Sequence, residues 1–329
     1  MFKEFIINSD TKTINLPELR PYTTRQFLCR GCENECMMSE LKFDDKSKYL
    51  TGNKCEKIHT NKGADAIRGQ NHYSYKQELI RSYIRPPVKN NPLTLGIPMG
   101  LNMYENFPFW SEFLSNCGIN VVVSDISTYK LYEKGTSTVM SDNICFPAKL
   151  MHGHIFNLLE QKVDRIFFPY IVYEQKDAPY LANSFNCPIV SAYSEVISSA
   201  IDTAQNYNTP LDAPTIDFNN KVLLKKACRK YLKSLNINLS NFDRIFEKAL
   251  EIDREFKHKL KQNCLDIVNN SATSKKPILL VAGRPYHTDP LIQHKLTDMI
   301  SDFGVDVISE DIIRNEDYGD FIDLNTVSQ

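Results

Sequence analysis

The stretch SEFLSNCGINVVVSDI (111–126) has a near copy in TDMISDFGVDVISEDI (297–312). At an offset of 186 residues the two stretches share five identical residues, and most of the remaining pairs are apolar in both. Each stretch has the pattern of a helix that ends at a glycine and leads into an apolar strand. The repeat therefore predicts two similar halves, each built around a parallel β-α-β unit.

The two halves differ in length. In the first half, LTLGIP (93–98) supplies a strand before the repeat, and DRIFFPY (164–170) and CPIVSAY (187–193) predict two more strands after it. In the second half, only PILLVAG (277–283) and VDVISED (305–311) have strand character. A two-stranded parallel sheet cannot bury both of its faces. We therefore expect the chain to be a fragment of a longer protein, or to borrow strands from a partner.

These patterns predict an α/β fold: a Rossmann-like parallel-sheet domain, a small cysteine-rich β-hairpin module before it, and the start of a second, similar half. Residues 221–268 have helical spacing, with an apolar stripe suited to packing on a core. The expected boundaries are 1–90 for the cysteine-rich module and linker, 91–205 for the first domain, 206–275 for a helical connector and 276–329 for the incomplete second half.

Composition argues against some partners. The chain has 329 residues, with 39 basic and 40 acidic side chains that are scattered along it. This balance gives no general attraction to nucleic acid or to an acidic membrane. No stretch has the apolar length of a membrane span, and the first residues lack the apolar core of a signal peptide. We therefore expect a cytoplasmic protein with reduced thiols.

Four of the nine cysteines fall in the first 55 residues: Cys29, Cys32, Cys36 and Cys55. The segment between Cys36 and Cys55 reads as a β-hairpin with the turn DDKS. If the turn centres on Asp45 and Lys46, residues whose numbers sum to 91 face each other, and the hairpin returns Cys55 to Cys36. The four thiols are therefore expected to converge on one metal centre.

Two metal centres are compatible with four thiolates. The C-x2-C-x3-C pattern with a remote fourth cysteine crowds three ligands into one loop, as in many iron-sulfur sites. A structural zinc site more often has two separated C-x2-C pairs. An iron-sulfur cluster is the main prediction, zinc is the alternative, and free thiols without a metal are the remaining reading.

Ligands of open parallel sheets bind beyond the carboxyl ends of the strands. Three loops qualify: PMGLNMYENFPFW after the first strand, ICFPAKLMHGH, and AGRPYHTDP in the second half. They supply six substrate-binding candidates, each of which could instead stabilise the loop that contains it: Asn102, Tyr104, Glu105, Lys149, Arg284 and His287.

Among the residues of these loops, Cys145 gives the most specific chemical prediction. Pro147 suits the first turn of a helix, which places Cys145 at the helix N-terminus, where the dipole and Lys149 favour a thiolate. Cys145 is therefore a further candidate metal ligand, although a buried, inert thiol fits as well. Cys187 precedes a predicted strand, at the wrong end of the sheet, so we assign it to packing together with Cys117, Cys228 and Cys264. His152 and His154 point to different helix faces and cannot share a metal.

The ordered motifs CRGCENEC, GNKCEK, GIPMGLNMYENFPFW, YEKG, ICFPAKLMHGH, VDRIFFPYIVYE and AGRPYHTDP, between about Arg20 and Asp311, resemble the activase-related proteins of the 2-hydroxyacyl-CoA dehydratase system. Larger members of this family join an ATPase activator to a region that is similar to the iron-sulfur subunits of the dehydratases. The resemblance implies anaerobic metabolism, ATP-driven transfer of low-potential electrons and an oxygen-sensitive cluster held by cysteines at strand ends.

Two departures from the family pattern limit what the resemblance implies. The chain has no G-x-x-x-x-G-K-[ST] loop, so we do not expect it to hydrolyse ATP. The strand after Cys145 ends in FFPYIVYE without a thiol, so Cys145 is expected to lack co-ligands.

The main hypothesis is an iron-sulfur redox module that docks with an ATPase activator, with a dehydratase subunit or with the missing part of a larger chain. One alternative is an acyl-CoA dehydratase subunit with its own cluster at Cys145 and with acyl-CoA near Arg284 or His287. The other is a zinc-stabilised, non-catalytic binding module or an inactive gene fragment.

Overall fold

The computed structural model describes residues 21–30, 36–53, 68–176 and 184–314. The chain divides into two compact units, Met1–Ala66 and Ile67–Gln329. The finer boundaries expected at residues 90, 205 and 275 stay predictions.

The first unit contains an antiparallel sheet of three strands, β1 (Tyr22–Leu28), β2 (Met37–Phe43) and β3 (Lys48–Thr51), in that order. The predicted hairpin is confirmed as β2 and β3. Its turn is closed by Asp45, whose carboxylate accepts a hydrogen bond from the backbone N–H of Ser47 at 2.9 Å. Strand β1 was not predicted, because YTTRQFL has little apolar alternation.

The register of the hairpin differs by one residue from the prediction. Ser39 faces Thr51 and Lys42 faces Lys48, so facing residue numbers sum to 90 rather than 91. Lys46 in the turn has φ 66°. The turn contains an odd number of residues rather than the even number that the prediction assumed, which shifts the pairing of the strands by one residue. Cys55 lies outside the described residues, so its expected pairing with Cys36 stays a prediction.

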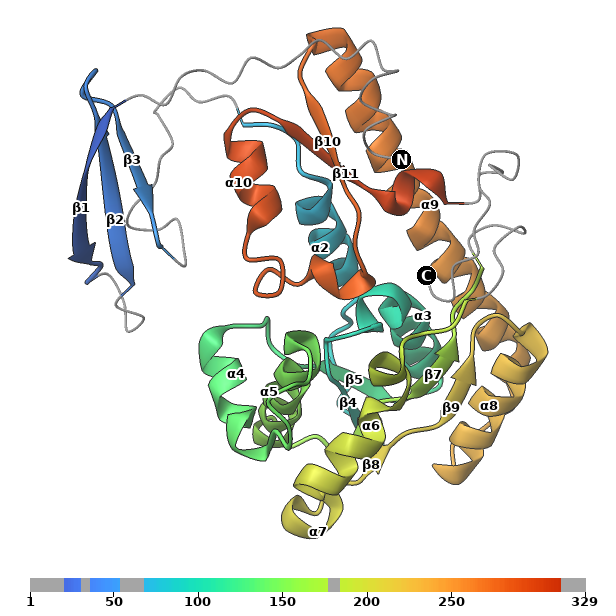
Figure 1. The fold of residues 1–329 in the computed structure, drawn as a ribbon. Helices are drawn as coiled ribbons and strands as arrows, with labels where there is room; N and C mark the ends of the chain where they lie inside the picture. Colours follow the sequence, from blue (N-terminus) through green and yellow to red (C-terminus); the bar gives the residue numbers. More distant parts are fainter. Residues whose placement is uncertain (1–20, 31–35, 54–67, 177–183, 315–329) are drawn as a thin grey trace. The chain divides into compact units, whose positions relative to one another are not determined.

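The second unit is built on a four-stranded parallel sheet in the order β5-β4-β6-β8 (Figure 1). The strands are β4 (Thr94–Ile97), β5 (Asn120–Val123), β6 (Arg165–Phe167) and β8 (Leu211–Asp212). A separate parallel pair is formed by β7 (Tyr170–Tyr173), which follows β6, and β9 (Thr215–Asp217), which follows β8. The predicted Rossmann-like parallel sheet is confirmed.

Two apolar clusters cover the two faces of this sheet. One contains Leu95 and Phe167 with the aromatic residues of α3 (Met103–Asn116), and the other contains Ile166 with α5 (Phe146–Glu160) and α6 (Pro188–Ile201). Helices on both faces explain why the strands read as continuous apolar runs rather than as alternating ones.

The predicted strand CPIVSAY (187–193) is wrong, because these residues begin helix α6. Pro188 occupies the first turn, where a missing N–H costs nothing. The buried residues Val190, Tyr193, Ile197 and Ile201 follow at steps of three or four, which is helical spacing. The short apolar run IV alone could not distinguish a strand from a buried helix.

Two glycines allow a close crossing of α4 (Tyr129–Gly135) and α5. A Cβ on Gly153 would lie 2.1 Å from the carbonyl oxygen of Leu131, and a Cβ on Gly135 would lie 2.3 Å from the backbone nitrogen of Gly153. The motifs YEKG and MHGH therefore serve helix packing at these positions. A short helix, α7 (Thr203–Tyr207), follows α6.

Three further helices complete the unit: α2 (His72–Ser82) and α9 (Phe242–Ser274) pack on the second half, and α8 (Lys221–Ser234) packs beside β9. The predicted apolar stripe is confirmed, since Phe246, Phe256 and Leu260 of α9 are fully buried against α3 and its neighbours.

The second half pairs β10 (Ile278–Val281) with β11 (Asp306–Ser309) in parallel, with α10 (Leu296–Asp302) between them. Its register, Ile278 with Asp306, repeats that of Thr94 with Asn120 in the first half. Within the described residues, the other edge of β10 has no paired strand. The predicted start of a second, similar half is confirmed. Two short 3-10 turns complete this half, η2 (Pro285–Thr288) and η3 (Glu310–Ile313), and another, η1 (Thr136–Thr138), follows α4.

Candidate functional site

Two helices on one face of the second unit begin with a similar local sequence, a cysteine with proline one or two residues later. Cys145 is the N-cap of α5 and Cys187 is the N-cap of α6, and each helix has proline in its first turn. The Cys187 sulfur accepts a hydrogen bond from the backbone N–H of Val190 at 3.4 Å. Cys145 is exposed and Cys187 is half-buried. The expected position of Cys145 is confirmed.

A tyrosine of the second half lies near both thiols. Burial raises the pKa of Tyr286, and the Cys187 and Cys145 sulfurs raise it further. Tyr286 and Cys187 also pack against the same apolar cluster. On the other side, Tyr193 of α6 lies near Cys145: burial, and then this sulfur, raises the pKa of Tyr193 to about 12.

The structure keeps Cys187 in a packing contact but overturns the reason for that assignment. Because Pro188–Ile201 is a helix, Cys187 precedes a helix rather than a strand. The expectation that Cys145 lacks co-ligands rested on the strand that ends in FFPYIVYE, and it stays a prediction. The signal that could have revealed the pair is the shared motif, a cysteine with proline within two residues.

Tyr193 is itself held by a buried histidine. The ring of His152 on α5 is 2.9 Å from the Tyr193 hydroxyl through Nε2 and 2.8 Å from the Thr138 hydroxyl through Nδ1. His154, two residues on, contacts different groups. As predicted, the two histidines point to different faces, and both serve structural contacts.

Asp289 joins the second half to the first through a chain of buried hydrogen bonds. Its carboxylate accepts hydrogen bonds from the hydroxyls of Tyr104 (2.9 Å) and Ser127. Ser127 Oγ lies 3.0 Å from His154 Nε2, and His154 Nδ1 lies 2.8 Å from the Ser124 hydroxyl. Asp289 also accepts hydrogen bonds from two backbone N–H groups, and burial raises the pKa of its carboxyl. The network fixes the turn that carries Tyr286 at the carboxyl ends of β4 and β5.

A second network holds the residue before Cys187. The carboxylate of Glu174 accepts hydrogen bonds from the side-chain amides of Asn102, Asn106 and Asn186. Asn186 also donates to the carbonyl of Ile171 at 3.1 Å. Burial raises the pKa of Glu174. The position of Cys187 is therefore tied to β7 and to the start of α3.

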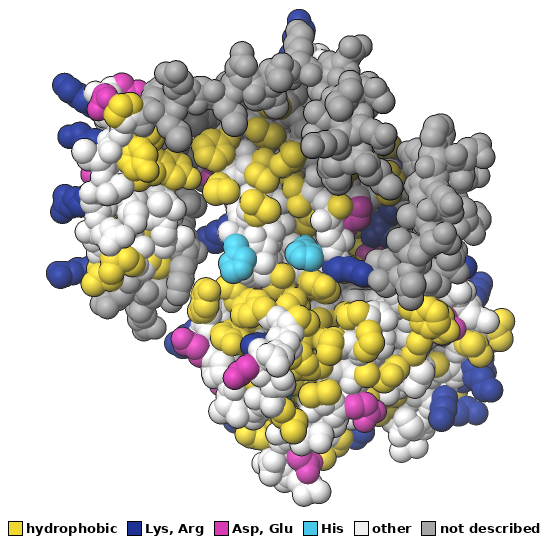
Figure 2. All heavy atoms as spheres, in the orientation of Figure 1, with side chains coloured by type: hydrophobic (Ala, Val, Ile, Leu, Met, Phe, Trp, Pro, Cys, Tyr) yellow, Lys and Arg dark blue, Asp and Glu magenta, His cyan; other side chains and the backbone are white. Residues whose placement is uncertain are grey.

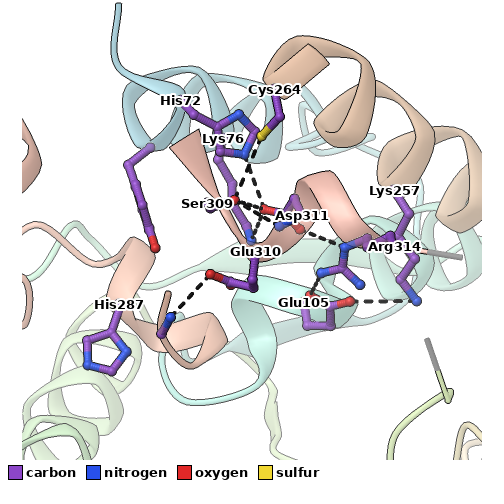
Figure 3. Close-up of polar contacts among 12 residues, drawn as sticks. His72, Lys76, Glu105, Lys257, Cys264, His287, Ser309, Glu310, Asp311 and Arg314 are labelled. Atoms are coloured by element: carbon purple, nitrogen blue, oxygen red, sulfur yellow. Dashed lines mark hydrogen bonds and ion pairs between the residues drawn. The ribbon is translucent and has the colours of Figure 1, made fainter. Parts of the chain in front are cut away.

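Glu105 belongs to a buried ion-pair network (Figure 3). Arg314 bridges the carboxylates of Glu105 (2.9 Å) and Asp311 (2.6 Å), while Lys257 lies 3.7 Å from Glu105. Burial favours the neutral acid, but Arg314 and Lys257 hold the pKa of Glu105 below its usual value.

The other end of this network is in α2. Lys76 lies 2.8 Å and His72 lies 3.1 Å from the carboxylate of Asp311. Although burial opposes ionisation, Lys76 and Arg314 hold the pKa of Asp311 well below its usual value. The network stabilises the packing of α2, α3, α9 and η3. Together, the three networks give Asn102, Tyr104 and Glu105 contacts within the protein.

Of the remaining substrate candidates, Arg284 and His287 belong to the η2 turn and Lys149 lies near the start of helix α5. His287 lies against Gly283, where a Cβ would come within 2.8 Å of the imidazole. Its Nδ1 lies 2.8 Å from the backbone nitrogen of Arg284 and 3.2 Å from the carbonyl oxygen of the same residue, so the imidazole closes this turn. Lys149 donates to the carbonyl of Asp142 at 2.8 Å. These residues stay candidates for contact with a ligand.

Figure 2 shows hydrophobic side chains gathered on both sides of a band in which histidine and Lys or Arg side chains reach the surface. A face that combines apolar and cationic groups suits a ligand with an apolar chain and anionic groups.

In the first unit, Cys29 and Cys36 face each other where the β1–β2 ladder ends. The N–H of Cys29 donates to the carbonyl of Cys36 at 2.8 Å, and both thiols are free and buried beside Met38. Gly52 follows β3 at φ 95°, and a Cβ there would lie 2.3 Å from the carbonyl oxygen of Met37. The third strand thus passes directly beside Cys36. Cys32 and Cys55 lie outside the described residues, within which no cluster of three metal-ligating side chains occurs.

The sequence pattern of one protein family, the CoA enzyme activase uncharacterised domain, matches residues 94–313. The chain belongs to this family. The match covers 220 of 329 residues, and it includes Cys145, Cys187, Tyr286 and Asp289 of the activase-related domain but not the cysteine-rich segment. Comparisons with curated proteins and with solved structures give no match. In the described part of this activase-related protein, no helix has the length and apolar character of a membrane span.

Proposed function

We propose that the chain is an iron-sulfur redox module that serves ATP-dependent activation of enzymes of the 2-hydroxyacyl-CoA dehydratase type. The observation that carries the proposal is the pair Cys29 and Cys36, two free, buried thiols that face each other at the end of a ladder. The loop between them contains Cys32, and the strand beside Cys36 leads to Cys55.

The donor set fits a thiolate-ligated cluster. The ladder sets the spacing of the Cys29 and Cys36 backbones, so two ligands are positioned before any metal binds. Phe27, Met38 and Leu50 pack around these two cysteines, and an apolar shell of this kind controls solvent access to a centre and its redox potential. A bound cluster would supply one-electron transfer, with Cys29, Cys32, Cys36 and Cys55 as its ligands.

Membership of the activase-related family supports the choice of partner, a dehydratase or its ATPase activator. Cysteine spacing is what favours an iron-sulfur cluster over zinc, which four thiolates also bind. With zinc, the segment would be a structural element of a binding module.

A second candidate function is suggested by the pair Cys145 and Cys187. Both thiols cap helices on one face of the domain, and Tyr286 lies near both. A cluster at this site would make the chain a dehydratase-like subunit, with acyl-CoA near Arg284 and His287.

The test is the content of iron, zinc and acid-labile sulfide per chain after strictly anaerobic purification. It compares wild type with Cys32→Ser, with Cys145→Ser and with a matched control, Cys117→Ser, whose thiol packs on the α3 side of the sheet. The proposal expects iron with matching sulfide, lost only in Cys32→Ser, and a signal of the reduced cluster by electron paramagnetic resonance.

The other outcomes are equally decisive. Zinc without sulfide contradicts the redox proposal and makes the segment a structural zinc site. Iron and sulfide that survive Cys32→Ser but are lost in Cys145→Ser favour the second candidate.

A further inference from the structure

Helix α8 concentrates positive charge to an unusual degree for this chain. Its sequence KVLLKKACRKYLKS has six Lys or Arg residues and no acid. The chain as a whole has a net charge of −1, so the residues outside α8 sum to −7 (−1 minus 6). Figure 1 places α8 at the periphery of the fold beside β9, and Figure 2 shows Lys and Arg side chains in the same area.

The structure explains one flank of this helix. Lys221 pairs with Glu247 at 2.8 Å, and Lys225 and Arg229 both pair with Asp243, at 2.9 and 2.8 Å. Arg229 also lies over the ring of Phe242, 4.4 Å from its centroid. These cations repeat every four residues and meet acids of α9 with the same spacing. Here the cations of α8 are matched by two acidic residues of α9, Asp243 and Glu247.

The neighbouring flank, which faces away from the core, has no such match. Lys226, Lys230 and Lys233 follow one another at steps of four and three, so they lie on one side of the helix, and all three are exposed. None forms an ion pair with any residue that the structure describes. Like charges at this spacing repel, which lowers the intrinsic stability of the helix. Lys233 alone gains from its place in the last turn.

Two aliphatic side chains extend the same surface at the start of the helix. Val222 is 75% exposed and Leu223 is 49% exposed, and Val222 has the largest exposure among the large hydrophobic residues of the described chain. The apolar residues that α8 needs for its own packing, Leu224 and Leu232 among them, are on the inner face. Val222 and Leu223 are therefore available to a partner.

We propose that this flank of α8, formed by Val222, Leu223, Lys226, Lys230 and Lys233, docks an acidic helix of the protein partner in the proposed redox function. The occupant follows from charge complementarity, because acids spaced four apart would match this flank as Asp243 and Glu247 match the other. An anionic membrane suits it less, since the apolar side chains are confined to one end rather than forming a face. Nucleic acid suits it less, since it has no aromatic side chain or arginine.

The identity of the partner rests on the proposed function, and the test uses the two proteins named there. Binding of the purified ATPase activator and of the purified dehydratase to the full chain is measured by biolayer interferometry at about 50 and about 300 mM salt. The variant K226E/K230E/K233E is compared with K89E/K130E/K162E, which makes the same charge change at exposed lysines elsewhere in the fold.

We expect one partner to bind wild type, with an affinity that falls at the higher salt concentration. The α8 variant should lower this affinity by about 30-fold or more, and the control variant by about 2-fold at most. Circular dichroism and metal content should match wild type in both variants, because α8 is remote in sequence from the cysteine-rich segment.

Absence of binding by both partners, or an equal effect of the two variants, overturns the docking inference. A loss of affinity only in Val222→Ser, with charge reversal silent, also overturns it, since the contact would then be apolar. Metal analysis tests the redox function separately: a chain without iron and sulfide could still show the α8 effect, and a chain with the cluster could lack it.

Discussion

Gly52 lies against the backbone carbonyl of Met37, one residue from Cys36, and at a φ of 95° that L side chains rarely adopt. Both properties exclude a Cβ at this position. Gly52 therefore fixes how closely the strand that leads to Cys55 approaches the facing thiols.

Gly52→Ala should lower the metal content of the chain to well under half of wild type, although no thiol is removed. The physical reason is that β3 must move away from Met37 to relieve the clash. Metal analysis after anaerobic purification measures the effect. Gly118→Ala, also at positive φ but with open space around it, is the control and should retain full metal content. Equal metal content in the two variants would contradict this role for Gly52.

Gly153→Ala should destabilise the second unit by roughly 2–4 kcal/mol, because the added methyl meets the Leu131 carbonyl and forces α4 away from α5. Gly118→Ala should cost only about 1 kcal/mol, since its penalty is conformational. Urea unfolding monitored by circular dichroism gives both free energies. If the two variants lose the same stability, the close helix crossing is not the cause.

His72 should make stability fall as the pH rises. Burial opposes its charged form, but the Asp311 carboxylate and the Cys264 side chain raise its pKa from 6.5 to about 9. The stabilisation is therefore complete below pH 6.5 and is lost as the pH rises through about 9, with a total on the order of 3 kcal/mol. In His72→Gln this loss between pH 6.5 and 9 should disappear, whereas the exposed His258→Gln should keep the wild-type slope. An unchanged slope in His72→Gln would exclude the mechanism.

His154 should act in the opposite direction. Burial lowers its pKa from 6.5 to about 3, so the unfolded chain binds a proton that the folded chain does not. Stability should then fall as the pH decreases from 6.5, by up to about 1.4 kcal/mol per pH unit from this residue. The difference in unfolding free energy between wild type and His154→Gln, measured from pH 7 to pH 4, isolates the effect. A difference that does not vary with pH would show that folding does not lower the pKa of His154.

Asp289→Asn should destabilise the chain by about 2–4 kcal/mol, because an amide nitrogen would then face donors that now meet a carboxylate. The exposed Asp142→Asn, which changes the charge equally, should have little effect. Thermal unfolding of both variants at neutral pH makes the comparison. A Tm of Asp289→Asn equal to that of the control would mean that the network does not bind the two halves together.

Local patterns predicted most of the fold. The repeat predicted strands β10 and β11. It also matched Gly118 with Gly304, and both glycines have φ 79°. The stripe of α9 and the helix start at Cys145 were also predicted, since each depends on residues a few positions apart. Strand β1 was missed because its residues are largely polar, and α6 was misassigned because a short apolar run fits either element.

The candidate site was harder to predict, because its networks join distant parts of the chain. Asp289 meets Tyr104 across 185 residues, and no spacing in the sequence indicates that contact. The proximity of Cys145 and Cys187 to Tyr286 likewise depends on the docking of the second half. The chemistry of the individual residues was visible in the sequence, whereas their grouping was not.

Helix α9 has 33 residues and is therefore about 50 Å long. Its first turns bury Phe242 and Phe246 in the core of the first half, and its last turns bury Ile267 against Ile308 of the second. During synthesis, the aromatic side chains of α3 can pack on the sheet, but they lack the cover of Phe242 and Phe246 until α9 has left the ribosome. The two halves should thus mature late and together, and a protease should find no stable intermediate that contains only one of them.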